Sequence, residues 1–401
     1  MDLKSGYPFW AVKNGLMYAF PKLEDDVQCD VAIIGAGITG ALIADELAAH
    51  GHDVCVLDQR DVGWGSTSAS TALLQYEIDT HMVDLAKQYG EADAVLAYRA
   101  CAEAIDLLAA KAAEVRDVDF ARMRSLYYAS KRGHRRDLED EFALRARHGF
   151  AVEWLTSGDV QDAYGFDAPC AILSQLAARI DPYRMAYRLL ARVQKAGGRV
   201  HDRTPVTRIA ANARGVELET GSGARIRAKH LVMAAGYASQ EFLRKDVAKN
   251  RSSYAFITDP IDSALLGPLS TTMLWESARP YLYMRTTGDG RLLVGGEDDD
   301  IDIPARRDVR VQAKARKLAE QVAKLFPHLP IKPAFAWGGT FAETSDGLPW
   351  FGAHQQHGPR VLFAMAYGGN GITYSMLGAG LLRALIERRK HPLARLFGFS
   401  R

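Results

Sequence analysis

The clearest hydrophobic pattern near the N-terminus predicts a strand, a helix and a second strand. A continuous apolar run of strand length occupies Val31 to Ile34. The stretch from Ala41 to His50 carries its apolar side chains at helical spacing, and Gly51 ends it. Val54 to Leu57 forms the next apolar run. This order is typical of a βαβ unit that opens a parallel sheet.

Glycines occupy the turn between the first strand and the helix. Gly35 permits a tight turn, Gly37 lets the backbone approach a pyrophosphate, and Gly40 lets the helix pack closely on the strand. Asp58 ends the second strand roughly 20 residues later, where an acid can bond an adenosine ribose. The helix N-terminus supplies N–H groups and positive dipole charge to phosphates. The alternative is a glycine-rich turn that binds nothing. The pattern favours a nucleotide site at Gly35, Ala36, Gly37, Ile38, Thr39 and Gly40.

The remaining pattern predicts further helices and short strands. Residues 1–29 read as an irregular arm, and His81 to about Gly149 reads as mostly helical. Asp181 is a plausible N-cap for a helix that begins at Pro182. Short strands fill 199–236, and alternating aromatic strands fill about 250–335. A helix is expected from about 308 to 326, and a last helix from 373 to 389 follows a glycine-rich loop.

Composition narrows the class of protein. Hydrophobic residues make up 48%, charged residues 24%, and the net charge is only +2, so no nucleic-acid partner is indicated. Four cysteines lie far apart without metal-ligand spacing, which indicates reduced thiols. No apolar window long enough to span a bilayer and no secretory signal is evident, and we expect a cytoplasmic protein. The run Glu297 to Asp300 reads as an exposed acidic turn rather than a metal site.

Separated segments resemble one family. They are the Gly35–Gly40 fingerprint with Asp58, the Gly65–Ser70 loop, the Leu231–Gly236 strand, Thr344–Pro349 and Gly368–Thr373. Together they resemble the D-amino-acid oxidase and glycine oxidase class of FAD-dependent oxidoreductases. The resemblance implies FAD rather than NAD.

The resemblance also implies a fold that is α/β and α+β. A Rossmann-like FAD-binding domain would be built from 30–80, 165–245 and 336–401, after the arm 1–29. An inserted antiparallel-sheet substrate domain would comprise 81–164 and 246–335. The cofactor-binding residues expected beyond the first glycine turn are Asp58, Gln59, Gly65, Ser66, Thr67, Ser70, Thr71, Leu73, Val206, Ala235, Gly236, Gly369, Asn370, Gly371, Ile372 and Thr373.

Two features depart from the family pattern. The arginine that grips the substrate carboxylate in glycine-oxidase-like members is missing from Trp337 to Glu343, and so is the cysteine that attaches the flavin covalently. FAD is therefore expected to bind noncovalently. Tyr281, Tyr283 and Arg285 alternate on a predicted strand, so they would share one face. Arg285 could supply the carboxylate contact, or the face could be packing aromatics with a surface arginine. Tyr254 is a further candidate.

We expect an enzyme that oxidises the C–N bond of an amine or amino acid. The carbon beside nitrogen would give a hydride to flavin N5, and water would hydrolyse the resulting imine. Oxygen or an electron carrier would reoxidise the flavin. Two alternatives remain: a 2-hydroxy-acid dehydrogenase of the same fold, and a non-catalytic FAD-binding partner subunit.

Overall fold

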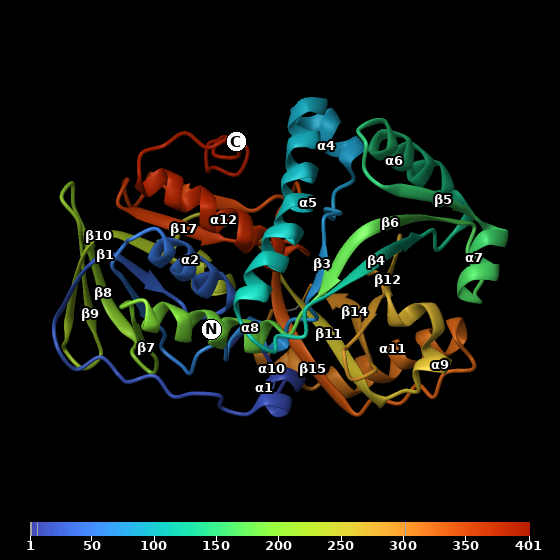
Figure 1. Ribbon diagram of the computed structural model, residues 1–401, viewed down its shortest axis with the longest axis horizontal. Coiled ribbons are helices and arrows are strands. Elements are labelled where there is room, and N and C mark those ends of the chain that lie inside the picture. The colour runs from blue at the N-terminus through green and yellow to red at the C-terminus, as the bar shows by residue number, and fades with distance from the viewer. Residues whose placement is uncertain (1, 6, 301) are drawn as a thin grey trace.

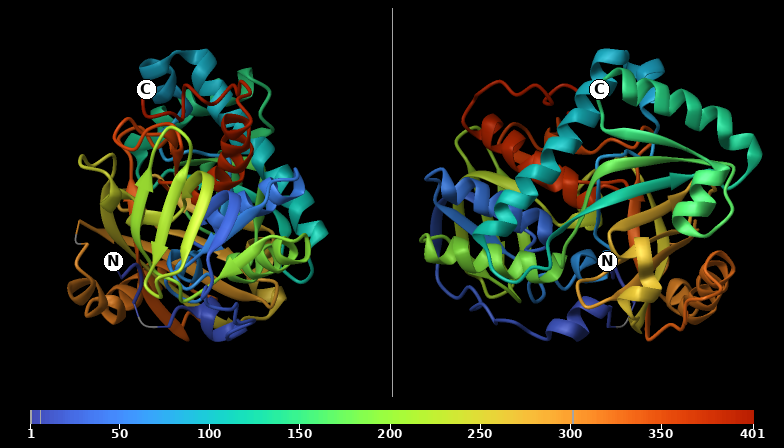
Figure 2. Two further views of the ribbon diagram at one scale, coloured as in Figure 1. Left: turned by 90° about the vertical axis from the view of Figure 1, so that its left-hand side faces the viewer. Right: turned by 45° about the vertical axis from the view of Figure 1, so that its right-hand side comes forward.

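Two sheets form the frame of the molecule. The computed structural model describes residues 2–5, 7–300 and 302–401. An eight-stranded sheet and a nine-stranded sheet occupy opposite ends of the long axis (Figure 1). The turned views show helices on the outer faces of both sheets (Figure 2). The expected combination of a Rossmann-like part with a largely antiparallel part is confirmed.

The eight-stranded sheet has a parallel centre. Its buried strands are apolar runs, as expected for a sheet covered on both faces. An antiparallel strand closes one edge, and a hairpin joins β10. The parallel strands, in spatial order, are β17 (Val361–Met365), β10 (Arg225–Met233), β1 (Val27–Ile34), β2 (Val54–Leu57) and β7 (Arg199–His201); the others are β16 (Trp350–Ala353), β8 (Val206–Ala211) and β9 (Val216–Thr220).

Helices cover this sheet and fix the carboxyl ends of its strands. α2 (Ile38–Ala49) packs between α8 (Pro182–Lys195) and α12 (Gly371–Ile386). The Asp181 side chain accepts a hydrogen bond from the Arg184 backbone N–H, and Pro182 is the first helical residue, so the predicted cap is confirmed. The long helix α5 (Glu91–Glu114) lies against α12.

The nine-stranded sheet is mostly antiparallel, with one parallel pair between β12 and β4. α11 (Val311–Leu325) packs its buried apolar side chains on β11, β14 and β15. The strands in spatial order are β15 (Phe335–Glu343), β11 (Lys249–Pro260), β14 (Arg291–Asp299), β13 (Tyr283–Thr286), β12 (Thr272–Glu276), β4 (Ala121–Tyr128), β6 (Cys170–Arg179) and β3 (Leu73–Gln75), while β5 (Val152–Thr156) pairs with β6.

The shorter helices connect these parts. They are α1 (Phe9–Asn14), α3 (Ser66–Ala69), α4 (Met82–Tyr89), α6 (Arg135–Arg147), α7 (Ser157–Tyr164), α9 (Ser263–Leu266) and α10 (Pro304–Asp308), with 3₁₀ turns at Arg132–His134, Gly236–Phe242 and Gly267–Ser270. Within the described ranges, no helix is long and apolar enough to cross a membrane.

Several sequence-based expectations differ from this fold. The stretch 81–149 is mostly helical, as expected, but β4 lies within it and pairs with β6 and β12. β3, β6 and β15 belong to the nine-stranded sheet, although the predicted boundaries placed their residues in the FAD-binding segments. The N-terminal arm contains α1, and β13 begins at Tyr283, so Tyr281 precedes the strand.

Candidate active site

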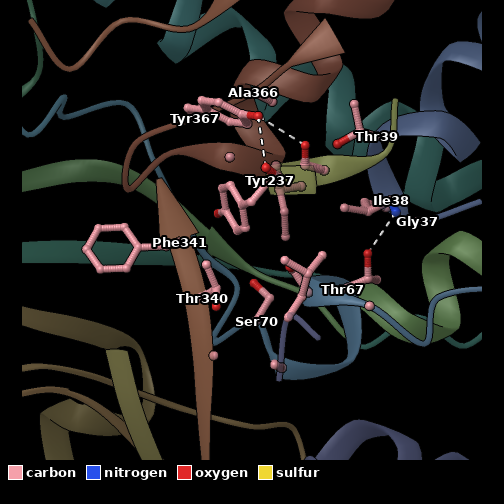
Figure 3. A pocket seen from close by; sticks show the side chains of 18 of the residues that line it. Gly37, Ile38, Thr39, Thr67, Ser70, Tyr237, Thr340, Phe341, Ala366 and Tyr367 are labelled. Carbon is pink, nitrogen blue, oxygen red and sulfur yellow. Dashed lines mark hydrogen bonds between the residues drawn. The ribbon is translucent and has the colours of Figure 1, made fainter. Parts of the chain in front are cut away.

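One cavity extends from the carboxyl ends of β1, β2 and β10 to the nine-stranded sheet. Ligands of open α/β sheets bind at such strand ends. Figure 3 shows Thr67 directed at Ile38 on one side, and Thr340 and Phe341 on β15 across the cavity. The site therefore lies where the two sheets meet.

The glycine turn is shaped for close backbone approach. Gly35 has φ +110°, and a Cβ there would lie 2.2 Å from the Ala234 carbonyl oxygen. Thr67 Oγ1 accepts a hydrogen bond of 2.9 Å from the Ile38 N–H, which joins the 65–70 loop to the start of α2. Gly37, the N-cap of α2, lines the cavity. This arrangement is an anion cradle of the dinucleotide type.

Asp58 braces the same turn. Its Oδ2 accepts from the Ala36 N–H at 2.8 Å, and its Oδ1 accepts from the Arg60 N–H at 2.9 Å. Burial raises the pKa of Asp58 in spite of these two hydrogen bonds. The carboxylate also borders the cavity, so it shapes the turn and is accessible from the space beside it.

We predict that Asp58→Asn weakens FAD binding about 10- to 100-fold, the cost of a lost charge-assisted hydrogen bond. The NH₂ group of the asparagine would also face the backbone N–H of Ala36 or Arg60, so that two donors meet where a carboxylate oxygen now accepts. Fluorescence titration of the apoprotein with FAD measures the change. An unchanged affinity would show that Asp58 does not contact the nucleotide.

Most of the sequence-predicted cofactor residues line the cavity. They are Gly35, Gly37, Ile38, Thr39, Asp58, Gln59, Gly65, Ser66, Thr67, Ser70, Thr71, Leu73, Val206, Ala235, Gly236, Gly369, Asn370, Gly371 and Ile372. Ala36, Gly40 and Thr373 do not line it. They support the wall from behind: the Ala36 N–H bonds Asp58, Gly40 packs against the Gly35 carbonyl, and Thr373 Oγ1 donates to the Gln75 carbonyl.

The glycine-rich loop before α12 is fastened to the segment after β3. The Gly369 N–H donates to Asp79 Oδ2 at 2.8 Å, and Asn370 Nδ2 donates to the Glu77 carbonyl at 2.8 Å. No side chain caps the N-terminus of α12 at Asn370, which lines the cavity. The partial positive charge of this N-terminus is therefore directed at the cavity, beside the Asp79 carboxylate that accepts from Gly369.

The part of the cavity next to this loop is its aromatic end, since Asp79 also accepts from Tyr281. Tyr254, Tyr281 and Tyr283 line it, as the sequence suggested. The rings of Tyr281 and Tyr283 have centroids 5.7 Å apart, and Tyr281 also lies edge-on to Trp275 at 6.5 Å. Sequence reasoning missed further lining residues that come from distant segments: Gln75, Glu77, Asp79, Tyr237, Ser253, Trp275, Asp298, Thr340, Phe341 and Tyr367. Only the alternation of Gln75, Glu77 and Asp79 past β3 offered a local signal.

Arg285 does not line the cavity, and the expectation that it grips a substrate carboxylate is corrected. Its side chain is fully buried, and its guanidinium donates to the carbonyls of Thr71 (2.7 Å), Thr286 (3.2 Å) and Ile180 (3.0 Å). Burial lowers the pKa of Arg285 to about 10. Because backbone carbonyl oxygens occupy the N–H donors of its guanidinium, Arg285 holds the Thr71 segment in place from behind the cavity wall.

The run Glu297 to Asp300 is not an exposed acidic turn. Its first three residues end β14. Glu297 is buried and accepts from Lys314 and Lys317, and Asp299 accepts from Tyr254 and Lys314. Asp298 lines the cavity, and only Asp300 is exposed. Among the described residues, no cluster that could hold a metal ion is present.

Comparisons with known proteins agree with this geometry. The model of the DAO family, FAD dependent oxidoreductase, matches residues 30–385. Gamma-glutamylputrescine oxidoreductase of Escherichia coli (strain K12) is 24% identical over 397 residues, covering 94% of this chain and 88% of that protein. Glycine oxidase of Geobacillus kaustophilus (strain HTA426) is 27% identical over 377 residues, covering 90% and 93%.

Solved structures share the fold. The crystal structure of glycine oxidase from Geobacillus kaustophilus aligns with a TM-score of 0.75 at 23% identity, covering 94% of this chain and 99% of that one. L-proline dehydrogenase from P. horikoshii aligns with a TM-score of 0.78 at 16% identity, covering 94% and 98%. The fold and the cavity define an FAD-dependent oxidoreductase. The chain belongs to the DAO family of these enzymes.

The cavity fits FAD. Gly35 and Gly37 have no room for a side chain, since a Cβ would lie 2.2 Å from the Ala234 carbonyl oxygen or 2.9 Å from Thr67 Oγ1, so bare backbone lines the cavity at both positions. Ser66 Oγ is buried on the lining and has no partner within the described chain, so it is available to a ligand acceptor or donor. None of the four cysteines is among the described residues that line the cavity, in keeping with noncovalent binding.

Proposed function

We propose that this enzyme oxidises the C–N bond of an amine or amino acid. The observation that carries the proposal is the continuity of one cavity from the dinucleotide turn at Gly35 to the tyrosines on the nine-stranded sheet. A flavin held at the first end would share this cavity with a substrate held at the second. Glycine oxidase and gamma-glutamylputrescine oxidoreductase, which are similar along most of the chain, bear names that concern such substrates.

The lining residues bind and orient the substrate and exclude water from it. Tyr281 Oη donates to Asp79 Oδ1 at 3.0 Å, so this ring is fixed against the loop that precedes α12. Tyr283 Oη and Ser253 Oγ lie 3.4 Å apart, and burial raises the pKa of Tyr283 to about 12. Neither the Tyr281 nor the Tyr283 hydroxyl is ionised at neutral pH, so both are hydrogen-bonding groups rather than bases.

No strong base stands at the cavity. Among the lining residues that the structure describes there is no histidine, lysine or cysteine. FAD, when bound, would supply the redox step as the acceptor of the hydride, and water would hydrolyse the imine product. The chain needs no side-chain nucleophile for this reaction, only a dry and ordered cavity.

Anaerobic spectroscopy tests the proposal. The FAD-loaded protein is mixed separately with primary and secondary amines, amino acids and 2-hydroxy acids, and flavin absorbance is followed. We expect bleaching by at least one amine or amino acid. Bleaching by a 2-hydroxy acid alone would identify the hydroxy-acid alternative, and a flavin that no compound of the three classes bleaches would favour a non-catalytic FAD-binding subunit.

A further inference from the structure

Negative charge predominates at the aromatic end of the cavity. Asp79 and Asp298 line it there. Arg60 is the one lining arginine within the described residues, and it follows Asp58 at the nucleotide end. A zwitterionic substrate would therefore place its carboxylate against two acids with no lining cation to meet it.

Asp298 is an acid without a basic partner. Its Oδ1 is buried and has no hydrogen bond within the described structure, although Ser253 bonds the carboxyl. The two adjacent acids do have basic partners. Glu297 contacts Lys314 and Lys317, and Asp299 contacts Lys314 and Arg310. A buried carboxylate with an open oxygen on a cavity wall is arranged for a ligand that brings its own positive charge.

The other acids of the region already have partners. Asp79 accepts from the Gly369 N–H and from Tyr281 Oη. Glu77 faces the buried guanidinium of Arg145, whose Nη1 lies 3.9 Å from Glu77 Oε1. Neither Glu77 oxygen has a hydrogen bond, but Glu77 faces this buried charge, so among these three acids Asp298 is the one with neither an ion pair nor a backbone N–H donor within the described residues.

Aromatic rings complete a cation site. Tyr281, Tyr283 and Trp275 all line this end of the cavity, and their rings contact one another. Arg279 shows that this group of rings accepts a cation, since its guanidinium lies 4.4 Å from the Tyr281 ring centroid. Arg279 itself is exposed, does not line the cavity, and donates to the Asp79 carbonyl.

We propose that the aromatic end is a cation site in which Asp298 and the surrounding rings bind the ammonium of an alkylamine that carries no carboxylate beside it. This inference rests on the proposed function and deepens it, because it selects carboxylate-free amines from the wider class. Asp298 acts as a binding and specificity residue.

Calorimetric titration of the FAD-loaded protein tests the site without turnover. The probe is butyltrimethylammonium, whose nitrogen has no lone pair to drive hydride loss, and pentanoate is the anionic counterpart of similar length. We expect the cation to bind more tightly than pentanoate. Asp298→Asn should weaken cation binding about 10- to 100-fold. Asp300→Asn is the matched control, because Asp300 is exposed and bonds Lys249 and Arg251, and it should leave the affinity unchanged.

The pH dependence and the stability give a second readout. Burial, reinforced by Asp79, raises the pKa of Asp298 to about 6, while Ser253 and Arg279 act in the opposite direction and Glu343 adds to the rise. Cation binding needs the ionised carboxylate, so affinity should fall as the pH drops through about 6. Because the ionised form is disfavoured in the folded state, Asp298→Asn should raise Tm at pH 8 in the absence of ligand, and the gain should vanish toward about pH 4. A purely structural acid would instead lower Tm when replaced.

The outcomes separate this proposal from the proposed function. Tighter binding of pentanoate than of the cation, or cation binding indifferent to Asp298→Asn, would overturn the cation site even if some amine bleached the flavin. Preference for 2-aminopentanoate over butylamine that disappears in Arg279→Gln would also overturn it and assign carboxylate recognition to Arg279. Asp298-dependent cation binding without any bleaching would support the site and contradict the amine oxidation.

Discussion

Gly40→Ala is expected to destroy tight FAD binding. A Cβ on Gly40 would lie 1.8 Å from the Gly35 carbonyl oxygen, so α2 must move away from the turn that follows β1. Gly35 and Gly37 line the cavity at that turn, and their displacement removes the anion cradle. An overpacking penalty of about 3 kcal/mol corresponds to about 100-fold in affinity. FAD content after purification and titration of the apoprotein measure the loss.

Gly380→Ala is the control for this prediction. Gly380 also lies in a helix, α12, and no heavy atom stands within 4 Å of an added Cβ. Alanine should leave FAD binding intact and raise the free energy of unfolding by up to about 1 kcal/mol through helix propensity. Equal FAD affinity in the two variants would contradict the role given to the turn.

Arg285→Met is expected to destabilise the protein by about 3–5 kcal/mol, since three backbone carbonyls lose a charged donor in a buried place. The guanidinium also lies 5.5 Å from the Trp10 ring, and Trp10 Nε1 donates to the Ser70 carbonyl. Loss of Arg285 therefore loosens the Ser70–Thr71 part of the wall. Arg285→Lys should rescue little, because one ammonium cannot reproduce the planar fork.

Thermal and urea unfolding measure the Arg285 effect. Arg188→Met, on the exposed side of α8, is the control and should change stability by less than about 1 kcal/mol. Because Arg285 lies behind the cavity wall, any change in kcat/KM should be similar for carboxylated and carboxylate-free substrates. A rise in KM restricted to carboxylated substrates, in a variant of unchanged stability, would restore Arg285 to the substrate site.

The nucleotide-binding half of the site could be predicted from local sequence signals. The Gly35–Gly40 spacing, the apolar runs around it and the cap at Asp181 all depend on contacts within a few residues or on one supersecondary unit. Such features follow from backbone geometry and helix capping, which depend on residues that lie close together in the sequence.

The substrate half depended on contacts between distant segments. β4 lies in a stretch of helix formers and charges, and its pairing with β6 and β12 decided its state. Asp298 lies in an acidic run typical of a turn, yet β14 extends to Asp299 because it pairs with β11, and α11 supplies Lys314 and Lys317 to Glu297. Alternation placed Arg285 near Tyr283 but could not show that the carbonyls of Thr71 and Ile180 cover it.

Rapid anaerobic mixing of the FAD-loaded enzyme with a carboxylate-free primary alkylamine shows whether this enzyme oxidises C–N bonds. The amine is compared with its analogue deuterated on the carbon beside nitrogen. We expect flavin bleaching, one equivalent of aldehyde per flavin after hydrolysis, and slower bleaching with the deuterated amine. A flavin that stays oxidised with every amine and amino acid, while a 2-hydroxy acid reduces it, would rule out C–N oxidation as the function of the enzyme.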